Sequence, residues 1–312
     1  MYDTIIIGSG PAGLTAAIYA ARREMKVLVI GMIPGGQVSL ASEIENYPGF
    51  DKISSFELIT KMQNQVINNN VEILNAEVKK IDKKDDYFTL FTEKDMFETK
   101  TVILAMGMIP RRLAILGEKE LTGKGVSYCA NCDGPFYRNK NVVVVGGGNA
   151  ALDAAEVLSK IAKKVFLIHR NETFKAFEIL VEKVKEKENI EILLNSDISK
   201  INGNSKVESI DVVNSKNKEE KNIAIDGVFI EVGRIASTDL VSDLVNRDEK
   251  NQILVDEKCK TKTDGLFACG DVTQVPFKQI TIATGQATIA ALAAYQYLQL
   301  KKGAIVNVYD RN

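Results

Sequence analysis

The feature that most constrains the fold of this chain is a pattern that occurs twice. In each copy an apolar run is followed by a glycine-rich turn and then by a helix-forming stretch, over residues 2–22 and again over residues 141–162. Apolar runs without polar alternation are typical of strands buried on both faces of a parallel sheet. We therefore predict an α/β protein with two doubly wound, Rossmann-like dinucleotide-binding domains, the second inserted into the first.

The glycine turns are the expected cofactor sites. In such a turn one glycine permits the tight bend, another lets a pyrophosphate approach the backbone, and the helix N-terminus offers free N–H groups to the phosphates. The alternative is that the glycines only allow helix and strand to pack closely. The predicted ligands are Gly8, Ser9, Gly10, Pro11, Ala12 and Gly13 in the first copy, and Gly146, Gly148, Asn149 and Ala150 in the second.

The second copy continues into an apolar run that ends near residue 170, where proteins of this fold recognise the ribose of the nucleotide. No carboxylate stands there to bind a 2′-hydroxyl. His169, Arg170 and Lys175 are found instead, and they suit a 2′-phosphate. A solvated basic strand end is the alternative.

The last third of the chain is assigned to the first domain. Residues 265–271 form a short apolar run that ends in Gly-Asp, and residues 280–298 form an alanine-rich predicted helix. We place the two crossovers between domains near residues 110–116 and 242–248. The predicted divisions are 1–112 and 245–312 for the first domain and 113–244 for the inserted one.

The cysteines indicate redox chemistry. Two cysteines spaced like Cys129 and Cys132 can close a small disulfide ring, in which one sulfur attacks while the other resolves. Zinc is disfavoured because a second such pair is missing and His169 is the only histidine, so no metal is predicted. Asp133 can exchange the proton that the reaction requires, or it can serve in a helix cap or turn. Cys269 lies in an apolar run and is expected to be a buried, unreactive thiol.

Charge and patterning restrict the partners. The chain has 40 basic and 41 acidic residues, evenly mixed, for a net charge of −1. This balance gives no field for nucleic acid or an anionic membrane. Because the N-terminus lacks a basic region before a cleavable apolar run and no apolar stretch reaches about 18 residues, we expect a cytoplasmic protein.

Several segments, taken together, resemble the low-molecular-weight thioredoxin reductases, a family of FAD-containing pyridine nucleotide-disulfide oxidoreductases. The resemblance covers essentially the whole chain. The matching motifs are GSGPAG at 8–13, GGQ at 35–37, ENYPGF at 45–50, YCANCDG at 128–134, GGGNAA at 146–151 and FACGD at 267–271.

The resemblance implies a thioredoxin-disulfide reductase that uses FAD and NADPH, acts on thioredoxin or a thioredoxin-like small protein, and forms a homodimer. It also implies that Cys132 faces the flavin, that Cys129 attacks the partner disulfide, that Asp133 is the acid, and that the inserted domain swings. Beyond the first glycine turn, the implied FAD ligands are Gly36, Gln37, Asn46, Gly107, Gly270, Asp271, Lys278, Gln279 and Ile280.

The nucleotide motif departs from the family pattern. The family usually has His-Arg-Arg and then, after three intervening residues, another Arg, whereas this chain has Asn171 and Lys175 at the last two basic positions and Glu172 close by. A lysine lacks the bidentate fork of arginine, so weaker NADPH binding is expected, and NADH or reduced ferredoxin are alternative donors. Ala287 also replaces a usual glycine. A ferredoxin-dependent flavin thioredoxin reductase and the reductase of a peroxiredoxin carrier protein are the competing functions.

Overall fold

The computed structural model describes residues 1–41 and 43–304. The chain divides into two compact units: Met1–Ile109 with the chain from Ile235 onward, and the inserted unit Pro110–Arg234. The chain passes between the units at β9 (Ile109–Pro110) and β18 (Arg234–Ile235), which pair with each other as a two-stranded sheet.

The first unit is built on a sheet in the order β5-β2-β1-β8-β7-β6, with β19 pairing with β8. Five of these strands are parallel and form its centre, whereas β6 and β7 are an antiparallel extension. The strands are β1 (Tyr2–Ile7), β2 (Val27–Ile30), β5 (Glu72–Leu74), β6 (Lys80–Lys83), β7 (Phe88–Phe91), β8 (Met96–Leu104) and β19 (Leu266–Ala268).

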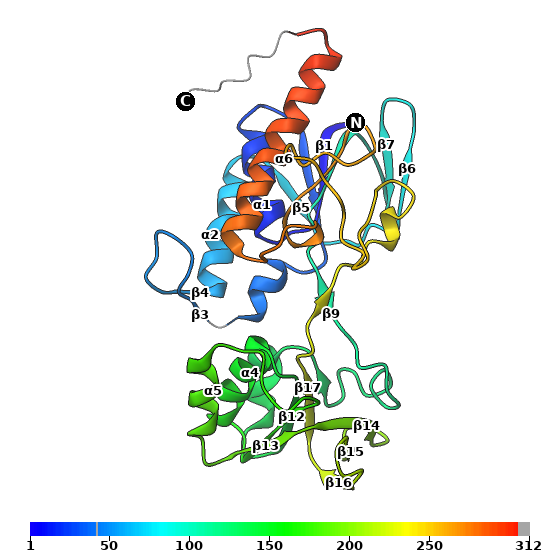
Figure 1. Cartoon of the computed structure of the whole chain (residues 1–312). Coiled ribbons are helices and arrows are strands. Elements are labelled where there is room, and N and C mark those ends of the chain that lie inside the picture. Colours follow the sequence, from blue (N-terminus) through cyan, green and yellow to red (C-terminus); the bar gives the residue numbers. More distant parts are fainter. Residues whose placement is uncertain (42, 305–312) are drawn as a thin grey trace. The chain divides into compact units, whose positions relative to one another are not determined.

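Helices cover this sheet. α1 (Pro11–Ala21) packs against both α2 (Ser55–Asn68) and α6 (Ile280–Lys301), and the three run side by side in Figure 1. α1 begins at Pro11, directly after the glycine turn, because the fixed φ of proline suits the first helical position. Short elements complete the unit: η1 (Gly36–Leu40), β3 (Glu43–Ile44), β4 (Ile53–Ser54), η3 (Asp239–Val241) and η4 (Gly270–Val272).

The second crossover does not lie where the sequence predicted it. Val241 and Val245 are 1% and 3% exposed and belong to the core of the first unit. Residues 235–244 therefore belong to the first unit and not to the inserted one, and the first boundary lies at 109/110 instead of 112/113. The crossover at Arg234–Ile235 is part of a short strand, β18, and not of a loop.

The inserted unit has its own parallel sheet, in the order β10-β17-β11-β12-β13, and an antiparallel sheet of three strands. α4 begins at Asn149, directly after the glycine turn. The elements are β10 (Val126–Ser127), α3 (Ala130–Asp133), η2 (Gly134–Tyr137), β11 (Asn141–Val145), α4 (Asn149–Ser159), β12 (Lys164–His169), α5 (Glu178–Lys185), β13 (Ile190–Leu194), β14 (Ser196–Asn202), β15 (Ser209–Asn214), β16 (Glu220–Ala224) and β17 (Gly227–Ile230).

The predicted fold class is confirmed, since each unit carries a parallel sheet that starts with a strand, a glycine turn and a helix. Among residues 1–41 and 43–304, no helix has the length and apolar character needed to span a membrane.

Candidate functional site: the Cys129–Cys132 disulfide and two glycine turns

The two cysteines of the CxxC motif form a disulfide, with their Cα atoms 5.4 Å apart. Cys129 is the N-cap residue of the short helix α3, and its Sγ accepts a hydrogen bond of 3.1 Å from the backbone N–H of Cys132. Cys129 is buried, with 8% of its surface exposed, whereas Cys132 is exposed. The motif therefore presents Cys132 more openly than Cys129 in this oxidised form.

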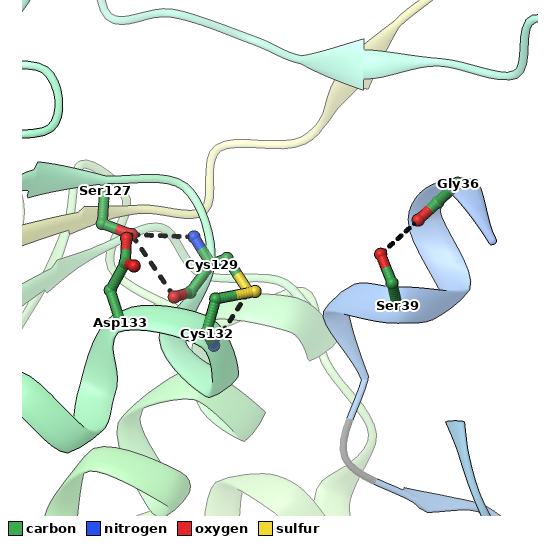
Figure 2. Close-up of a disulfide and its surroundings, with 6 residues drawn as sticks. All are labelled: Gly36, Ser39, Ser127, Cys129, Cys132 and Asp133. Carbon is green, nitrogen blue, oxygen red and sulfur yellow. Dashed lines mark hydrogen bonds between the residues drawn. A yellow bond between two sulfur atoms is a disulfide. The ribbon is translucent and has the colours of Figure 1, made fainter. Parts of the chain in front are cut away.

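Asp133 is the last residue of α3 and directly follows Cys132, and its carboxylate accepts a hydrogen bond of 2.6 Å from the hydroxyl of Ser127 (Figure 2). The alternative role as a helix cap is not what the structure shows, because Asp133 makes no side-chain cap bond to the helix that follows it. Its carboxylate is held by Ser127, two residues before the CxxC motif.

Sequence reasoning missed a buried anchor next to this motif. Glu118 is 2% exposed, and its carboxylate accepts bonds from the backbone N–H groups of Leu113 (3.1 Å) and Ala114 (2.6 Å) and from the hydroxyl of Tyr128 (2.7 Å). Burial and the neighbouring Glu118 raise the pKa of Tyr128 to about 12. Tyr128 directly precedes Cys129, so this carboxylate ties the start of the unit to the redox motif. A glutamate in a charged stretch of sequence carries no signal of such burial.

The first glycine turn has the close packing that a dinucleotide fold requires. Gly8 has φ of +117°, and a Cβ there would collide with the Ala105 carbonyl; a Cβ on Gly13 would collide with the carbonyl of Gly8. Gly10 is the N-cap of α1 and offers no side chain to the first helical N–H groups. These N–H groups are therefore available for phosphate oxygens.

Residues far apart in the sequence converge on this turn. The Gln37 amide donates to the Asp271 carboxylate at 3.3 Å, and the Asn46 amide donates to the Gln279 side chain at 3.1 Å. Three predicted glycine ligands also lie close to these residues. A Cβ added to Gly270 would lie 3.0 Å from the Ala12 Cβ, and one added to Gly36 would lie 3.1 Å from the Gly10 Cα. A Cβ added to Gly107 would lie 3.4 Å from the Gln37 amide nitrogen. These contacts bring Gly36, Gln37, Gly107, Gly270 and Asp271 together near the glycine turn that follows β1.

The segment after Asp271 is held by side chains. The Lys278 ammonium donates to the Thr273 carbonyl at 2.7 Å, and burial lowers the pKa of Lys278 although Asp271 and Asp248 act in the opposite direction. Gln279 is the N-cap of α6, and Ile280 is its first residue. Gln286, which the sequence analysis did not single out, accepts bonds from the Gly270 N–H (2.9 Å) and the Thr273 hydroxyl (3.1 Å).

The second glycine turn contacts two of the basic residues that follow or end β12. A Cβ on Gly147 would collide with the ring of His169, and the N–H of Lys175 donates to the Gly147 carbonyl at 2.7 Å. The side chain of Asn149 accepts from the backbone N–H of Phe177 at 2.8 Å. Gly148 is the N-cap of α4, whose first exposed residues are Asn149 and Ala150.

The predicted phosphate-binding residues separate into two kinds. His169 is buried, its Nε2 lies 3.1 Å from the Thr173 carbonyl, and burial lowers its pKa, so it supports the turn as a neutral ring. Arg170 and Lys175 are exposed and can meet an anion. Glu172 pairs with Lys216 at 2.9 Å, which offsets part of its negative charge.

Two further cysteines are buried in the first unit. Cys269 is 0% exposed, as predicted, and burial raises the pKa of its thiol. Burial also raises the pKa of Cys259 to about 11, so both thiols are protonated near neutral pH. In the described part of the chain, no cluster of histidine, cysteine and carboxylate side chains could hold a metal ion.

Known proteins share this architecture along the whole chain. Residues 2–287 match the family described as pyridine nucleotide-disulphide oxidoreductase. The thioredoxin reductase of Treponema pallidum is 40% identical over 299 residues, which are 95% of this chain and 97% of that protein.

Solved structures agree. The thioredoxin reductase of Lactococcus lactis, described as the FR conformation, has a TM-score of 0.89 and 41% identity over 96% of this chain and 99% of its own. A ferredoxin-flavin thioredoxin reductase of Clostridium acetobutylicum has a TM-score of 0.55 and 35% identity over 96% of this chain and 98% of its own. With its paired glycine turns, its internal disulfide and these near full-length similarities, the chain belongs to the pyridine nucleotide-disulphide oxidoreductase family.

Proposed function

We propose that this chain is a thioredoxin reductase, in which electrons pass from NADPH through FAD to the Cys129–Cys132 disulfide and then to thioredoxin or a thioredoxin-like small protein. The observation that carries the proposal is the disulfide with Asp133 beside it, in a domain that also has a dinucleotide-type glycine turn. The similarity to thioredoxin reductases over nearly the full length supports the same substrate class.

The first unit is the proposed FAD site. The uncapped first turn of α1 and the pair Gln37–Asp271 fit a pyrophosphate and its polyol arm. When bound, FAD supplies a two-electron relay between the nicotinamide and the disulfide. The N-terminus of α6, at Ile280, offers the positive end of a long helix dipole that would favour an anionic reduced cofactor.

In each thiol–disulfide exchange the attacking thiolate forms a new S–S bond and expels one thiolate from the old one, and that thiolate takes up one proton, for which Asp133 is the proposed donor. By family resemblance Cys129 attacks the partner and Cys132 meets the flavin. In this structure Cys132 is exposed and Cys129 is buried, which would favour attack on the partner by Cys132, so the roles of the two sulfurs are tested directly. Trapping decides it: with a disulfide-linked chromophore, Cys132→Ser should form the mixed disulfide if Cys129 attacks, and Cys129→Ser should form it if Cys132 attacks.

NADPH is the proposed donor because the second glycine turn is intact and Arg170 and Lys175 are exposed beside it. The loss of two family arginines keeps reduced ferredoxin and NADH as competing donors, and a ferredoxin-flavin enzyme is among the similar structures. Anaerobic stopped-flow reduction of the flavin by each of the three donors separates them. Fast reduction by NADPH supports the proposal, and reduction by ferredoxin alone overturns it. A homodimer is also proposed, and light scattering of the purified protein tests it.

A further inference from the structure

Ser127 lies at the end of β10, two residues before Cys129, and only 5% of its surface is exposed. Its hydroxyl oxygen has three polar neighbours: the Asp133 carboxylate at 2.6 Å, the Cys129 N–H at 3.0 Å and the Cys129 carbonyl at 3.3 Å. Figure 2 shows this hydroxyl between Asp133 and the backbone of Cys129.

A hydroxyl has one proton to donate and two lone pairs with which to accept. The Cys129 N–H occupies one lone pair, and the proton has two possible acceptors, the Asp133 carboxylate and the Cys129 carbonyl. When Asp133 is ionised, the hydroxyl can donate to it. When Asp133 is protonated, the carboxyl can donate to the remaining lone pair while the hydroxyl proton turns to the Cys129 carbonyl. Each protonation state of Asp133 therefore keeps its hydrogen bonds.

We propose that Ser127 is a positioning residue for Asp133: its hydroxyl holds the Asp133 carboxyl group near the backbone of Cys129 in both protonation states of the acid. The inference rests on the proposed function, in which Asp133 exchanges the proton of the disulfide step. An acid that cycles between two forms in a partly buried place needs a neighbour that can reverse its hydrogen-bond direction, because an unpaired polar group there is costly. A backbone N–H can only donate, so it could not accept the proton of the protonated carboxyl group.

The test measures the disulfide step apart from the electron donor. Holoenzyme is reduced fully with dithionite under anaerobic conditions and mixed with oxidised thioredoxin, and the return of oxidised flavin absorbance is followed. We expect Ser127→Ala to slow this rate about tenfold, the effect of losing one charge-assisted hydrogen bond. Ser127→Thr, which keeps the hydroxyl, is expected to react within about twofold of the wild-type rate. Ser127→Val has the shape of the threonine variant but no hydroxyl, so its rate should match that of Ser127→Ala. If Ser127→Ala does not fold, the Thr and Val pair carries the comparison.

The background of Asp133→Asn distinguishes positioning from simple packing. If Ser127 acts through Asp133, Ser127→Ala adds little further loss to Asp133→Asn; if its role is packing, the two losses multiply. Ser196→Ala is the matched control, since Ser196 is also 5% exposed and its hydroxyl donates to a backbone carbonyl, that of Leu194, at 2.9 Å. It is expected to leave the rate unchanged.

The possible failures are distinguishable. If Asp133→Asn slows the step and Ser127→Ala does not, or if the losses multiply, the inference about Ser127 is overturned while the proposed function stands. If Asp133→Asn has no effect, the acid role of Asp133 is overturned together with the role of Ser127. If wild-type reduced enzyme does not react with thioredoxin at all, the proposed function itself fails.

Discussion

Glu118 should be a principal source of stability in the inserted unit. Its buried carboxylate is the acceptor for two backbone N–H groups and one phenol hydroxyl. One of these donors belongs to Ala114, which has a φ of +59°, a left-handed conformation that costs about 1–2 kcal/mol in a residue with a Cβ. The carboxylate therefore holds a segment that would otherwise relax, and it links that segment to Tyr128 beside the CxxC motif.

The size of the effect follows from the hydrogen bonds. Glu118→Ala leaves three part-buried donors without their charged acceptor, and we expect a loss of about 3–5 kcal/mol of unfolding free energy, since a hydrogen bond to a charged group contributes about 1.5–3 kcal/mol. Glu118→Gln keeps one acceptor oxygen, and in either amide orientation its NH2 group faces a backbone N–H, so we expect about 1–3 kcal/mol. Glu120→Ala changes an exposed carboxylate two residues away and is expected to cost less than about 0.5 kcal/mol.

Hydrogen exchange followed by mass spectrometry is the appropriate assay, because a protein of two units need not unfold in one step. Peptides from residues 110–234 should lose protection in the order Ala, Gln, wild type at position 118, while peptides from the first unit change little. Protection equal to wild type in Glu118→Gln, or a smaller loss for Ala than for Gln, would refute the reasoning.

Three further predictions concern chemistry and pH. Asn171→Arg combined with Lys175→Arg is expected to lower the KM for NADPH about tenfold and leave that for NADH nearly unchanged, since only NADPH carries the 2′-phosphate; steady-state kinetics with both nucleotides checks this, and equal responses would contradict it. Cys129→Ser should leave a thiolate next to the flavin and give a long-wavelength charge-transfer band, absent in Cys132→Ser; the reverse pattern in anaerobic spectra exchanges the two roles. Burial lowers the pKa of His169 from its ordinary 6.5, so the unfolded chain binds this proton more tightly than the folded chain does. The inserted unit should therefore lose stability as the pH falls below about 6.5. Denaturation measured across this range should show a weaker pH dependence of stability in His169→Gln than in the wild type.

Much of the fold could be predicted from local pattern. The continuous apolar runs at residues 2–7 and 141–145 are the strands β1 and β11 with the predicted ends, because strands buried on both faces need apolar side chains at every position. The second crossover was misplaced because Val241 and Val245 look like a surface segment in sequence, and only the assembled core of the first unit explains their burial.

Some residues of the candidate site could likewise be predicted from local pattern, and others could not. Cys129, Cys132 and the glycine turns could be found because their chemistry depends on short spacing along the chain. Ser127 and Glu118 could not, because a serine or glutamate gains its role only from the donors and acceptors that the fold brings to it. His169 was predicted to meet a phosphate, yet its ring is buried against Gly147, a contact that no spacing rule reveals.

The central claim is that a flavin and the Cys129–Cys132 disulfide form one electron path to a thioredoxin, and an anaerobic reductive titration tests it most directly. The wild-type holoenzyme should take up two electrons for the flavin and two more for the disulfide, and oxidised thioredoxin should then remove them. The double replacement of both cysteines by serine should accept only the two electrons of the flavin and pass none to thioredoxin. Wild-type uptake limited to the flavin, or thioredoxin reduction that persists without the two cysteines, would contradict the account.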